Sequence, residues 1–212
     1  RKLGITIFSS PFDSSAVDLL EDLNVPAYKI ASFEAVDIPL IKYVASTKKP
    51  MIISTGMANK AEIQEAIDAA RSGGCTQLAI LHCVSGYPAP ASDYNLKTIA
   101  DMSSHFGVVT GLSDHTIDNT TAIASVALGA CIIEKHFTLD RNLPGPDHKA
   151  SLEPHELKAM VEGIRNVERA LGDGVKRPSP SELKNKPIAR KSLEAIRPIF
   201  AVEAFRAENI VA

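Results

Sequence analysis

Two histidines close two apolar segments of the sequence, and their matching positions predict a metal site. His115 ends the segment VVTGLSDH, and His136 is the penultimate residue of CIIEKHF. Two imidazoles, together with water or substrate oxygens, suit a divalent transition metal such as manganese or zinc. The alternative is that one of them is a hydrogen-bonded structural histidine. His82 also lies in the tail of an apolar segment, and its position fits the core as well as a site.

A lysine lies inside another apolar segment, AYKIASFE, where a positive charge needs compensation. Lys29 is costly there unless an anion faces it, because burial of an unpaired ammonium group is unfavourable. A phosphate or carboxylate ligand would supply that anion, whereas the alternative is a sheet-edge lysine facing water. Glu34, at the end of the same segment, could contact a sugar hydroxyl or transfer a proton. It could equally be a simple charge at a helix N-terminus.

Serines recur at the ends of the apolar segments, where they could bind phosphate. They are Ser10, Ser32, Ser54 and Ser113. Hydroxyl and backbone N–H groups at strand-to-helix turns can surround a phosphate without a P-loop, although any one such serine could be a helix cap. The sequence contains neither GxGxxG nor GxxxxGKS, which disfavours a nucleotide cofactor.

The polar loop that follows His136, TLDRNLPGPDHKAS, is expected to recognise a substrate. It would place Asp147 and His148 over the same site, and a solvated loop is the alternative. His105 and His155 lie on predicted loops or helix starts, where solvent exposure is the expectation, as it is by default for His148.

The elements that must position these residues are short apolar strands separated by helices. Six strands are predicted, at Ile5–Ser10, Ala27–Glu34, Met51–Gly56, Leu78–Cys83, Val108–His115 and Cys131–Phe137. The helices between them are predicted at Ser14–Leu23, Asp37–Ser46, Lys60–Gly73, Ser92–Phe106 and Ile117–Leu128. A last helix runs from Pro154 and stops at Gly172. This alternation is typical of a parallel sheet, whose ligands bind beyond the carboxyl ends of the strands.

The fold class that this pattern favours is α/β, as a TIM-type (β/α)₈ barrel with six of its eight β/α units visible. Either the first two units are missing from the chain, or the sheet is open and doubly wound. Polar tails on all six strands favour the barrel, since an open sheet concentrates its site at one switch point. The barrel domain is assigned to residues 1–174, a Pro, Ser and Lys-rich linker to 175–187, and the beginning of a further domain to 188–212.

Composition limits the partners. The 212 residues carry 23 basic and 25 acidic side chains, so we expect no nucleic-acid partner and no membrane partner, but a small molecule. Three cysteines without CxxC spacing give neither a zinc motif nor a disulfide framework, and a reducing cytoplasm is the expected location. No apolar run approaches the roughly 18 residues of a spanning helix.

Six motifs in this order resemble the N-acetylneuraminate (sialic acid) synthase family, including the pseudaminic and legionaminic acid synthases. They are KIASFE, ISTGM, LHCVSGYPAP, GLSDHT, IIEKHFTLDR and PGPDHKASLEP, and the resemblance covers Ile5 to Leu193. It implies an enzyme with a (β/α)₈ barrel that condenses phosphoenolpyruvate with an open-chain N-acetylated amino sugar. The products would be a nine-carbon 2-keto acid and phosphate. It also implies a C-terminal antifreeze-like (SAF) domain, of which only the start is present, and a homodimer of the full-length protein.

The resemblance also implies roles for individual residues. His115 and His136 would hold Mn²⁺ or Mg²⁺, and Lys29 and Glu34 would be the catalytic residues. The residues that would bind phosphoenolpyruvate are Lys29, Ser10, Ser32, Ser54 and Ser113, and those that would meet the sugar are Glu34, Tyr87 and Asp147.

The chain departs from the family pattern in three respects. Two strands that carry a catalytic glutamate and a second lysine are absent, as is most of the SAF domain, and Ser85 stands where sialic acid synthases often have Asn. The 212 residues alone are therefore expected to be inactive or nearly so. The acceptor sugar stays open, because SFE leans towards pseudaminic acid synthases and PGPDHKASLEP towards sialic acid synthases.

Two other functions compete with the synthase. One is a truncated, non-catalytic paralogue or binding remnant of the same family. The other is a different metal-dependent barrel enzyme, such as a hydrolase or an aldolase. The lack of an HxH or carboxylate-rich metal set and of an isolated Schiff-base lysine disfavours that second alternative.

Overall fold

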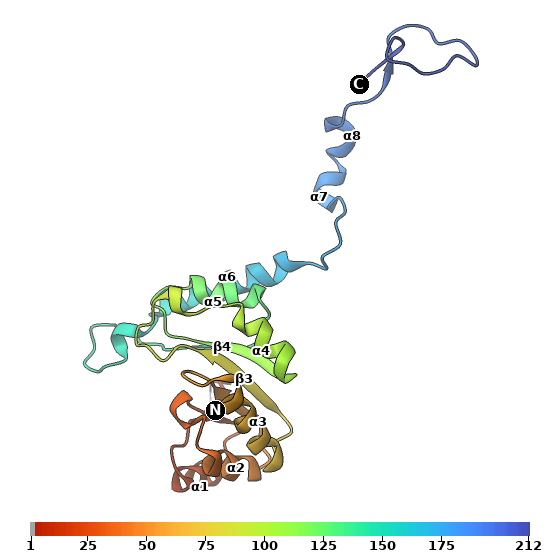
Figure 1. Ribbon diagram of the computed structural model, residues 1–212. Coiled ribbons are helices and arrows are strands. Elements are labelled where there is room, and N and C mark those ends of the chain that lie inside the picture. The colour runs from red at the N-terminus through yellow and green to blue at the C-terminus, as the bar shows by residue number, and fades with distance from the viewer. Residues whose placement is uncertain (1–2) are drawn as a thin grey trace. The chain divides into compact units, whose positions relative to one another are not determined.

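A curled sheet of five parallel strands organises the chain in the computed structural model, which describes residues 3–212 (Figure 1). The strands lie side by side in chain order, as a half-barrel. They are β1 (Tyr28–Ile30), β2 (Met51–Ser54), β3 (Leu78–Cys83), β4 (Val109–Asp114) and β5 (Ile133–Lys135). Sequential order with parallel pairing confirms the β/α repeat predicted from the sequence.

Helices connect the strands at nearly the predicted positions. They are α1 (Ser14–Asp22), α2 (Ile38–Ser46), α3 (Lys60–Ser72), α4 (Thr98–Phe106), α5 (Thr120–Ala127) and α6 (Pro154–Leu171). Side-chain caps fix several starts: Asn59 and Glu62 form a reciprocal capping box at α3. The predicted start at Ser92 is wrong, because a 3₁₀ turn, η2 (Ala91–Asp93), precedes α4.

The strand predicted at Ile5–Ser10 is also wrong. Within it only Ser9 makes a β-bridge, with Tyr28, and the apolar side chains of Ile5 and Ile7 are exposed. The sequence of this segment is compatible with a strand, but its neighbour β1 is only three residues long and offers few backbone groups for hydrogen bonding. The strand predicted at Ala27–Glu34 is too long, because the 3₁₀ turn η1 (Ser32–Glu34) follows β1 and ends the strand.

One face of the sheet is apolar and covered by helices. Tyr28, Ile53 and Ile80 on this outer face pack with Ile41 of α2 and Ile67 of α3, all almost fully buried. Burial of each such side chain contributes about 1.5–3 kcal/mol. A second apolar cluster, on the outer face of β4, contains Leu112, Tyr94 and Ile99. A third cluster, which contains Ala122 of α5, Met160 of α6 and Leu152, packs these two helices together.

The opposite, inner face carries the polar residues, because successive side chains of a strand point to opposite faces. The pairing register places on it Lys29 of β1, Ser54 of β2, Cys83 of β3, Ser113 of β4 and Glu134 of β5. The same alternation that buries one set of side chains under the helices thus collects the other set around a common inner surface.

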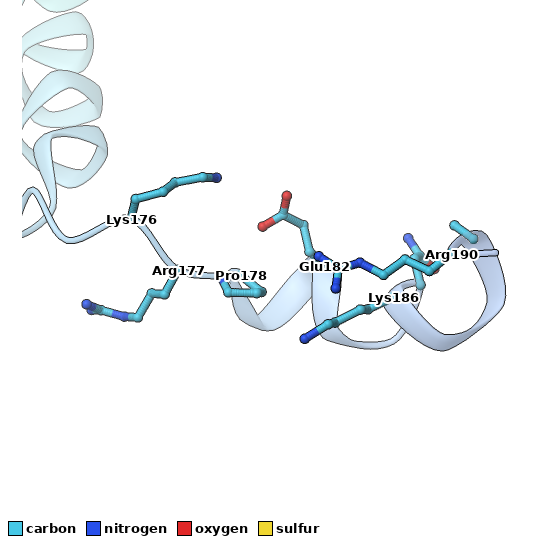
Figure 2. A pocket seen from close by; sticks show the side chains of 8 residues that line it. Lys176, Arg177, Pro178, Glu182, Lys186 and Arg190 are labelled. Carbon is cyan, nitrogen blue, oxygen red and sulfur yellow. The ribbon is translucent and has the colours of Figure 1, made fainter. Parts of the chain in front are cut away.

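Residues 172–212 form a separate unit with little buried structure. It contains α7 (Pro180–Leu183), α8 (Lys186–Ala189) and a two-residue antiparallel pair, β6 (Glu194–Ala195) with β7 (Ile210–Val211). Figure 2 shows a basic surface on it, with Lys176, Arg177, Lys186 and Arg190 around Glu182. The segment predicted as a linker, 175–187, therefore contains α7 and the first residues of α8. No helix within residues 3–212 is long and apolar enough to cross a membrane.

Gly111 should be essential for stability, because β4 passes very close to the chain before β5. A Cβ at this position would lie 2.3 Å from the Ile132 carbonyl oxygen and 2.7 Å from Leu81 Cδ2. The backbone atom cannot rotate away, so we expect Gly111→Ala to lower the free energy of unfolding by about 1–3 kcal/mol or more. Denaturant unfolding measures this. Gly86→Ala is the control, since its nearest neighbour would be Ala89 Cβ at 3.4 Å, and equal stability of the two variants would contradict the expectation.

Candidate active site

The register between β4 and β5 brings the two predicted metal ligands together. Ser113 pairs with Glu134 and Asp114 with Lys135, so the next residues along the two strands, His115 and His136, leave the sheet side by side. Their ring centroids are 5.2 Å apart. The two imidazoles therefore lie close enough to share one ion, at the carboxyl end of the sheet.

The His115 ring is fixed in an orientation that suits a metal ligand. Its Nδ1 lies 2.7 Å from the Val84 carbonyl oxygen, and its backbone N–H donates to Tyr94 Oη at 2.6 Å. A carbonyl only accepts hydrogen bonds, so Nδ1 carries the proton and Nε2 keeps a free lone pair. Burial alone would lower the pKa of His115, but contact with Cys83 and the bond to Val84 raise it above the ordinary value.

His136 is more open and lies under an aromatic ring. Its pKa is lowered by burial and then by the charge of His115, which favours the neutral, ligating form. Tyr87 packs against both histidines, with ring centroids 4.2 Å from His115 and 5.6 Å from His136. The exposed Asp147 places Oδ2 3.9 Å from His136 Nδ1. The structure thus gathers four of the predicted site residues.

Glu134, which was not among the predicted site residues, belongs to the same site. Its Oε1 accepts a hydrogen bond from Ser113 Oγ at 2.7 Å and pairs with Lys29 Nζ at 3.1 Å. Lys29 is 7% exposed, and here the anion that it requires is this carboxylate. The signal that could have found Glu134 is its position two residues before His136, on the same face of the strand.

Ser32, Ser85 and Gly56 lie together, and Ser54 lies on the same inner face as Lys29; these four residues are called the cradle below. Ser32 Oγ accepts from the Gly56 backbone N–H at 3.1 Å and donates to Cys83 Sγ at 3.3 Å. Within residues 3–212, the buried hydroxyls of Ser54 and Ser85 have no hydrogen-bond partner. A Cβ on Gly56 would lie 2.2 Å from Ser85 Oγ and 2.8 Å from Ser32 Oγ. Unpaired buried hydroxyls near a buried lysine are groups that an oxyanion would satisfy.

Two predicted residues lie less centrally. Glu34 is half-buried, burial raises the pKa of its carboxyl, and its Oε2 finds no partner in the described part of the chain. Ser10 is half-buried ahead of α1 and is not among the residues joined by the contacts above. Glu34 is thus an available proton carrier or hydrogen-bond acceptor, whereas nothing in the geometry singles out Ser10.

His82 does not face the site. It lies half-buried on the outer face of β3, where its Nε2 donates to the Tyr94 carbonyl oxygen, and burial lowers its pKa. The other correction concerns His148, expected in solvent by default, whose half-buried ring instead bonds Thr138 Oγ1 through Nδ1 at 2.7 Å.

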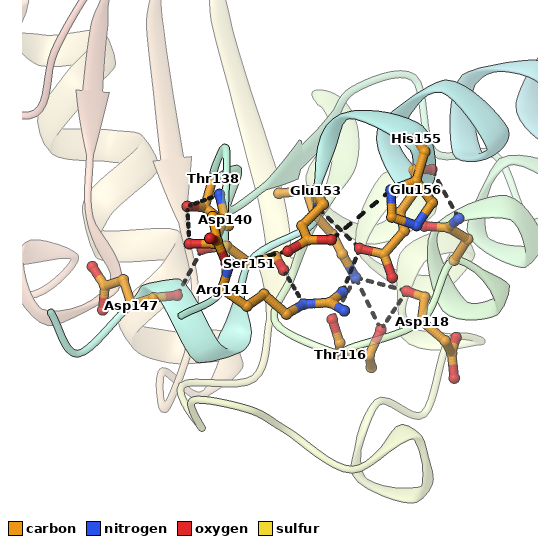
Figure 3. Close-up of polar contacts among 12 residues, drawn as sticks. Thr116, Asp118, Thr138, Asp140, Arg141, Asp147, Ser151, Glu153, His155 and Glu156 are labelled. Atoms are coloured by element: carbon orange, nitrogen blue, oxygen red, sulfur yellow. Dashed lines mark hydrogen bonds and ion pairs between the residues drawn. The ribbon is translucent and has the colours of Figure 1, made fainter. Parts of the chain in front are cut away.

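The loop between β5 and α6 is held by its own polar contacts (Figure 3). Arg141 Nε donates to the Ser151 carbonyl at 2.9 Å, and its guanidinium pairs with Glu156. Glu153, His155 and Glu156 are the only compact group of three possible metal ligands among the described residues. Because Glu156 forms an ion pair with Arg141, we interpret this group as one that stabilises the loop.

The donor set at His115 and His136 fits a divalent ion. Two imidazoles that can ligate in their neutral form, with carboxylates nearby, suit manganese. The remaining coordination positions would be open to water or substrate oxygens. No third side-chain ligand atom in the described residues groups closely with the pair. An ion held by these two imidazoles would therefore keep coordination positions open to water or substrate oxygens.

Fold and site together define a parallel α/β half-barrel with a polar site at the carboxyl ends of its strands. The chain belongs to the NeuB family, whose model matches residues 1–176. It is 46% identical over 212 residues to an N,N'-diacetyllegionaminic acid synthase of Campylobacter jejuni, covering 99% of this chain and 64% of that protein. It is 44% identical over 212 residues to a pseudaminic acid synthase of Helicobacter pylori, covering 100% of this chain and 62% of that one.

Among solved structures, the chain is similar to a sialic acid synthetase of Leptospira borgpetersenii in complex with citrate. The TM-score is 0.81 at 34% identity, covering 90% of this chain and 68% of the other. The resemblance seen in the motifs is thereby confirmed. The chain spans less than two thirds of the length of the two synthases that it matches by sequence.

Proposed function

We propose that the protein joins phosphoenolpyruvate to an N-acetylated amino sugar, giving a nine-carbon 2-keto acid of the sialic acid type and phosphate. The observation that carries this proposal is the pairing of His115 with His136 beside the contact of Lys29 with Glu134, in a chain related to named synthases of such acids. Similarity to those synthases does not favour the alternative of a non-catalytic remnant.

Phosphoenolpyruvate would occupy the cradle next to Lys29. Its negative charge would replace part of the interaction between Lys29 and Glu134, and its oxygens would accept from the free hydroxyls of Ser54 and Ser85. Ser32, Ser113 and Ser10 complete the proposed set. Positioning of a flexible anion by several fixed donors is itself a large contribution to rate.

The sugar would lie over the two histidines. His115 and His136 would hold Mn²⁺ or Mg²⁺, and a bound ion of this kind polarises an aldehyde oxygen. Tyr87 and Asp147 border the same place, and Glu34, whose half-buried carboxyl has an oxygen without a partner, would serve as a hydrogen-bonding or proton-transferring group. The methylene carbon of phosphoenolpyruvate would then attack the aldehyde carbon. Water adds to the resulting cationic enol carbon, and phosphate leaves.

The wider context of the enzyme belongs to the same proposal. It includes a (β/α)₈ barrel of eight units, an antifreeze-like domain that begins in residues 188–212, a homodimer and a cytoplasmic location. The 212 residues by themselves should be inactive or nearly so, since the Lys29 cradle and the histidine pair lie on an open half-barrel.

Phosphate release from phosphoenolpyruvate tests the proposal. The protein is used as its gene encodes it, with any flanking sequence, in the presence of Mn²⁺, and N-acetylmannosamine is compared with a 6-deoxy diacetamido hexose. We expect release that depends on one of the two sugars, which also identifies the acceptor. Bound Mn²⁺ without release with either sugar would favour the non-catalytic alternative.

A further inference from the structure

A buried ion pair lies directly behind the two histidines, on the outer face of the sheet. Lys135 Nζ and Asp114 Oδ2 are 2.8 Å apart, and their side chains are 3% and 0% exposed. The strand register pairs the same two residues, each one position before a histidine. Because side chains alternate, the ion pair and the imidazoles belong to opposite faces of the same two strands.

Lys135 does more than neutralise Asp114. Its ammonium group also donates to the Thr116 carbonyl at 2.6 Å, to Thr116 Oγ1 at 3.1 Å and to the Asp118 carbonyl at 2.8 Å. Four acceptors thus surround a group with three N–H donors. Thr116 and Asp118 lie together in Figure 3, on the turn that leads from β4 to α5.

Asp114 fixes the same turn from its other end. Its Oδ1 accepts from the Thr116 backbone N–H at 2.9 Å, and its Oδ2 accepts from Thr116 Oγ1 at 3.2 Å. His115 lies between these two residues, so the backbone on both sides of it is tied to Lys135. His136 is the residue that follows Lys135.

We propose that Lys135 is a positioning residue that sets the spacing and direction of His115 relative to His136. The inference rests on the proposed function in taking the two histidines as metal ligands. The network joins one ligand's turn to the neighbour of the other ligand, so its loss would let the two imidazoles move independently.

A purely structural role is the competing explanation, and it predicts something different. Replacement of a buried ion pair by apolar groups of similar size is often neutral or stabilising, whereas removal of one partner is harmful. A structural role would therefore appear in thermal stability and leave metal binding by the folded protein unchanged. A positioning role would appear in the metal affinity and in the ligand field of the bound ion.

The experiment compares Lys135→Met with Lys49→Met in the protein as its gene encodes it. Lys49 forms the matched control, because its ion pair with Glu21, at 2.7 Å, lies away from the histidines. Mn²⁺ affinity is measured by electron paramagnetic resonance at a temperature where circular dichroism shows each variant folded. The absorption spectrum of bound Co²⁺ reports ligand geometry.

We expect Lys135→Met to weaken Mn²⁺ binding by about 10-fold to 100-fold, the usual effect of losing a group that orients a metal ligand, and to change the Co²⁺ spectrum. Lys49→Met should change neither. If Lys135→Met does not fold, the double variant Asp114→Asn with Lys135→Met, which leaves no unpaired charge, carries the same expectation. Unchanged affinity and spectrum would overturn this inference alone, whereas absence of Mn²⁺ binding in the unaltered protein would overturn the metal assignment as well.

Discussion

Replacement of His115 by alanine is expected to weaken Mn²⁺ binding and to lower sugar-dependent phosphate release, each by more than about 100-fold. Loss of a group that merely orients a ligand costs about 10-fold to 100-fold in affinity, and loss of the ligand itself should exceed that. His115 is the better fixed of the two imidazoles, because Val84 holds its Nδ1 and leaves Nε2 for the ion. Titration of Mn²⁺ and an assay of released phosphate measure the two effects.

The matched control for this variant is His82→Gln. His82 also lies near the carboxyl end of a strand, but it lies on the outer face, and glutamine retains an N–H donor for the Tyr94 carbonyl. We expect near-normal Mn²⁺ binding in this control. Since His115 is only 5% exposed, thermal unfolding of both variants must show that they are folded at the assay temperature. Retention of Mn²⁺ binding by folded His115→Ala would contradict the assignment.

Replacement of Lys29 by methionine is expected to reduce kcat/KM for phosphoenolpyruvate by roughly 30-fold to several thousand-fold. The range corresponds to about 2–5 kcal/mol, the cost expected when a lysine that is itself only 7% exposed loses its charged contact with an anionic substrate. Methionine approximates the length of the side chain but removes the cation that faces Glu134 at 3.1 Å. The carboxylate would then keep Ser113 as a partner and repel an incoming anion.

Steady-state kinetics with varied phosphoenolpyruvate distinguishes this effect from general damage. Lys49→Met serves again as control, because it removes a partly buried ion pair elsewhere in the same unit. A rise in KM for phosphoenolpyruvate in Lys29→Met, with a smaller change in KM for the sugar, is the expected pattern. Equal changes for both substrates would contradict the placement of phosphoenolpyruvate beside Lys29.

Much of the fold could be predicted from apolar segment length and spacing. The five observed strands lie within predicted segments, and α2 and α3 agree with the predicted helices to within a residue or so at each end. Ile5–Ser10 was misassigned because alternation in a short segment does not reveal whether a partner strand is present. The helix start predicted at Ser92 is too early, because a separate 3₁₀ turn at Ala91–Asp93 precedes α4, which begins at Thr98.

The site was harder to predict, because the sequence at the end of a strand shows which residue types are present but does not show which face of the sheet each side chain points to. His82 and His115 look alike in the sequence, and only the register shows that one lies under the helices and the other faces the site. Glu134 was missed for the same reason, although its spacing from His136 places it on the inner face. The partnership of Lys29 with Glu134 joins strands far apart in the sequence, and no local pattern encodes it.

The one-to-one register of β4 with β5 also couples correct folding to chemistry. A slip of β5 by a single residue would exchange its faces, turning Glu134 and His136 towards the helices and Lys135 towards the inner surface. Asp114 would then be buried without its cation, and an unpaired buried charge strongly destabilises a folded protein. The mispaired state that would separate the two histidines is therefore also the one that the buried charges disfavour, so a chain that folds stably at this edge also has its two imidazoles side by side.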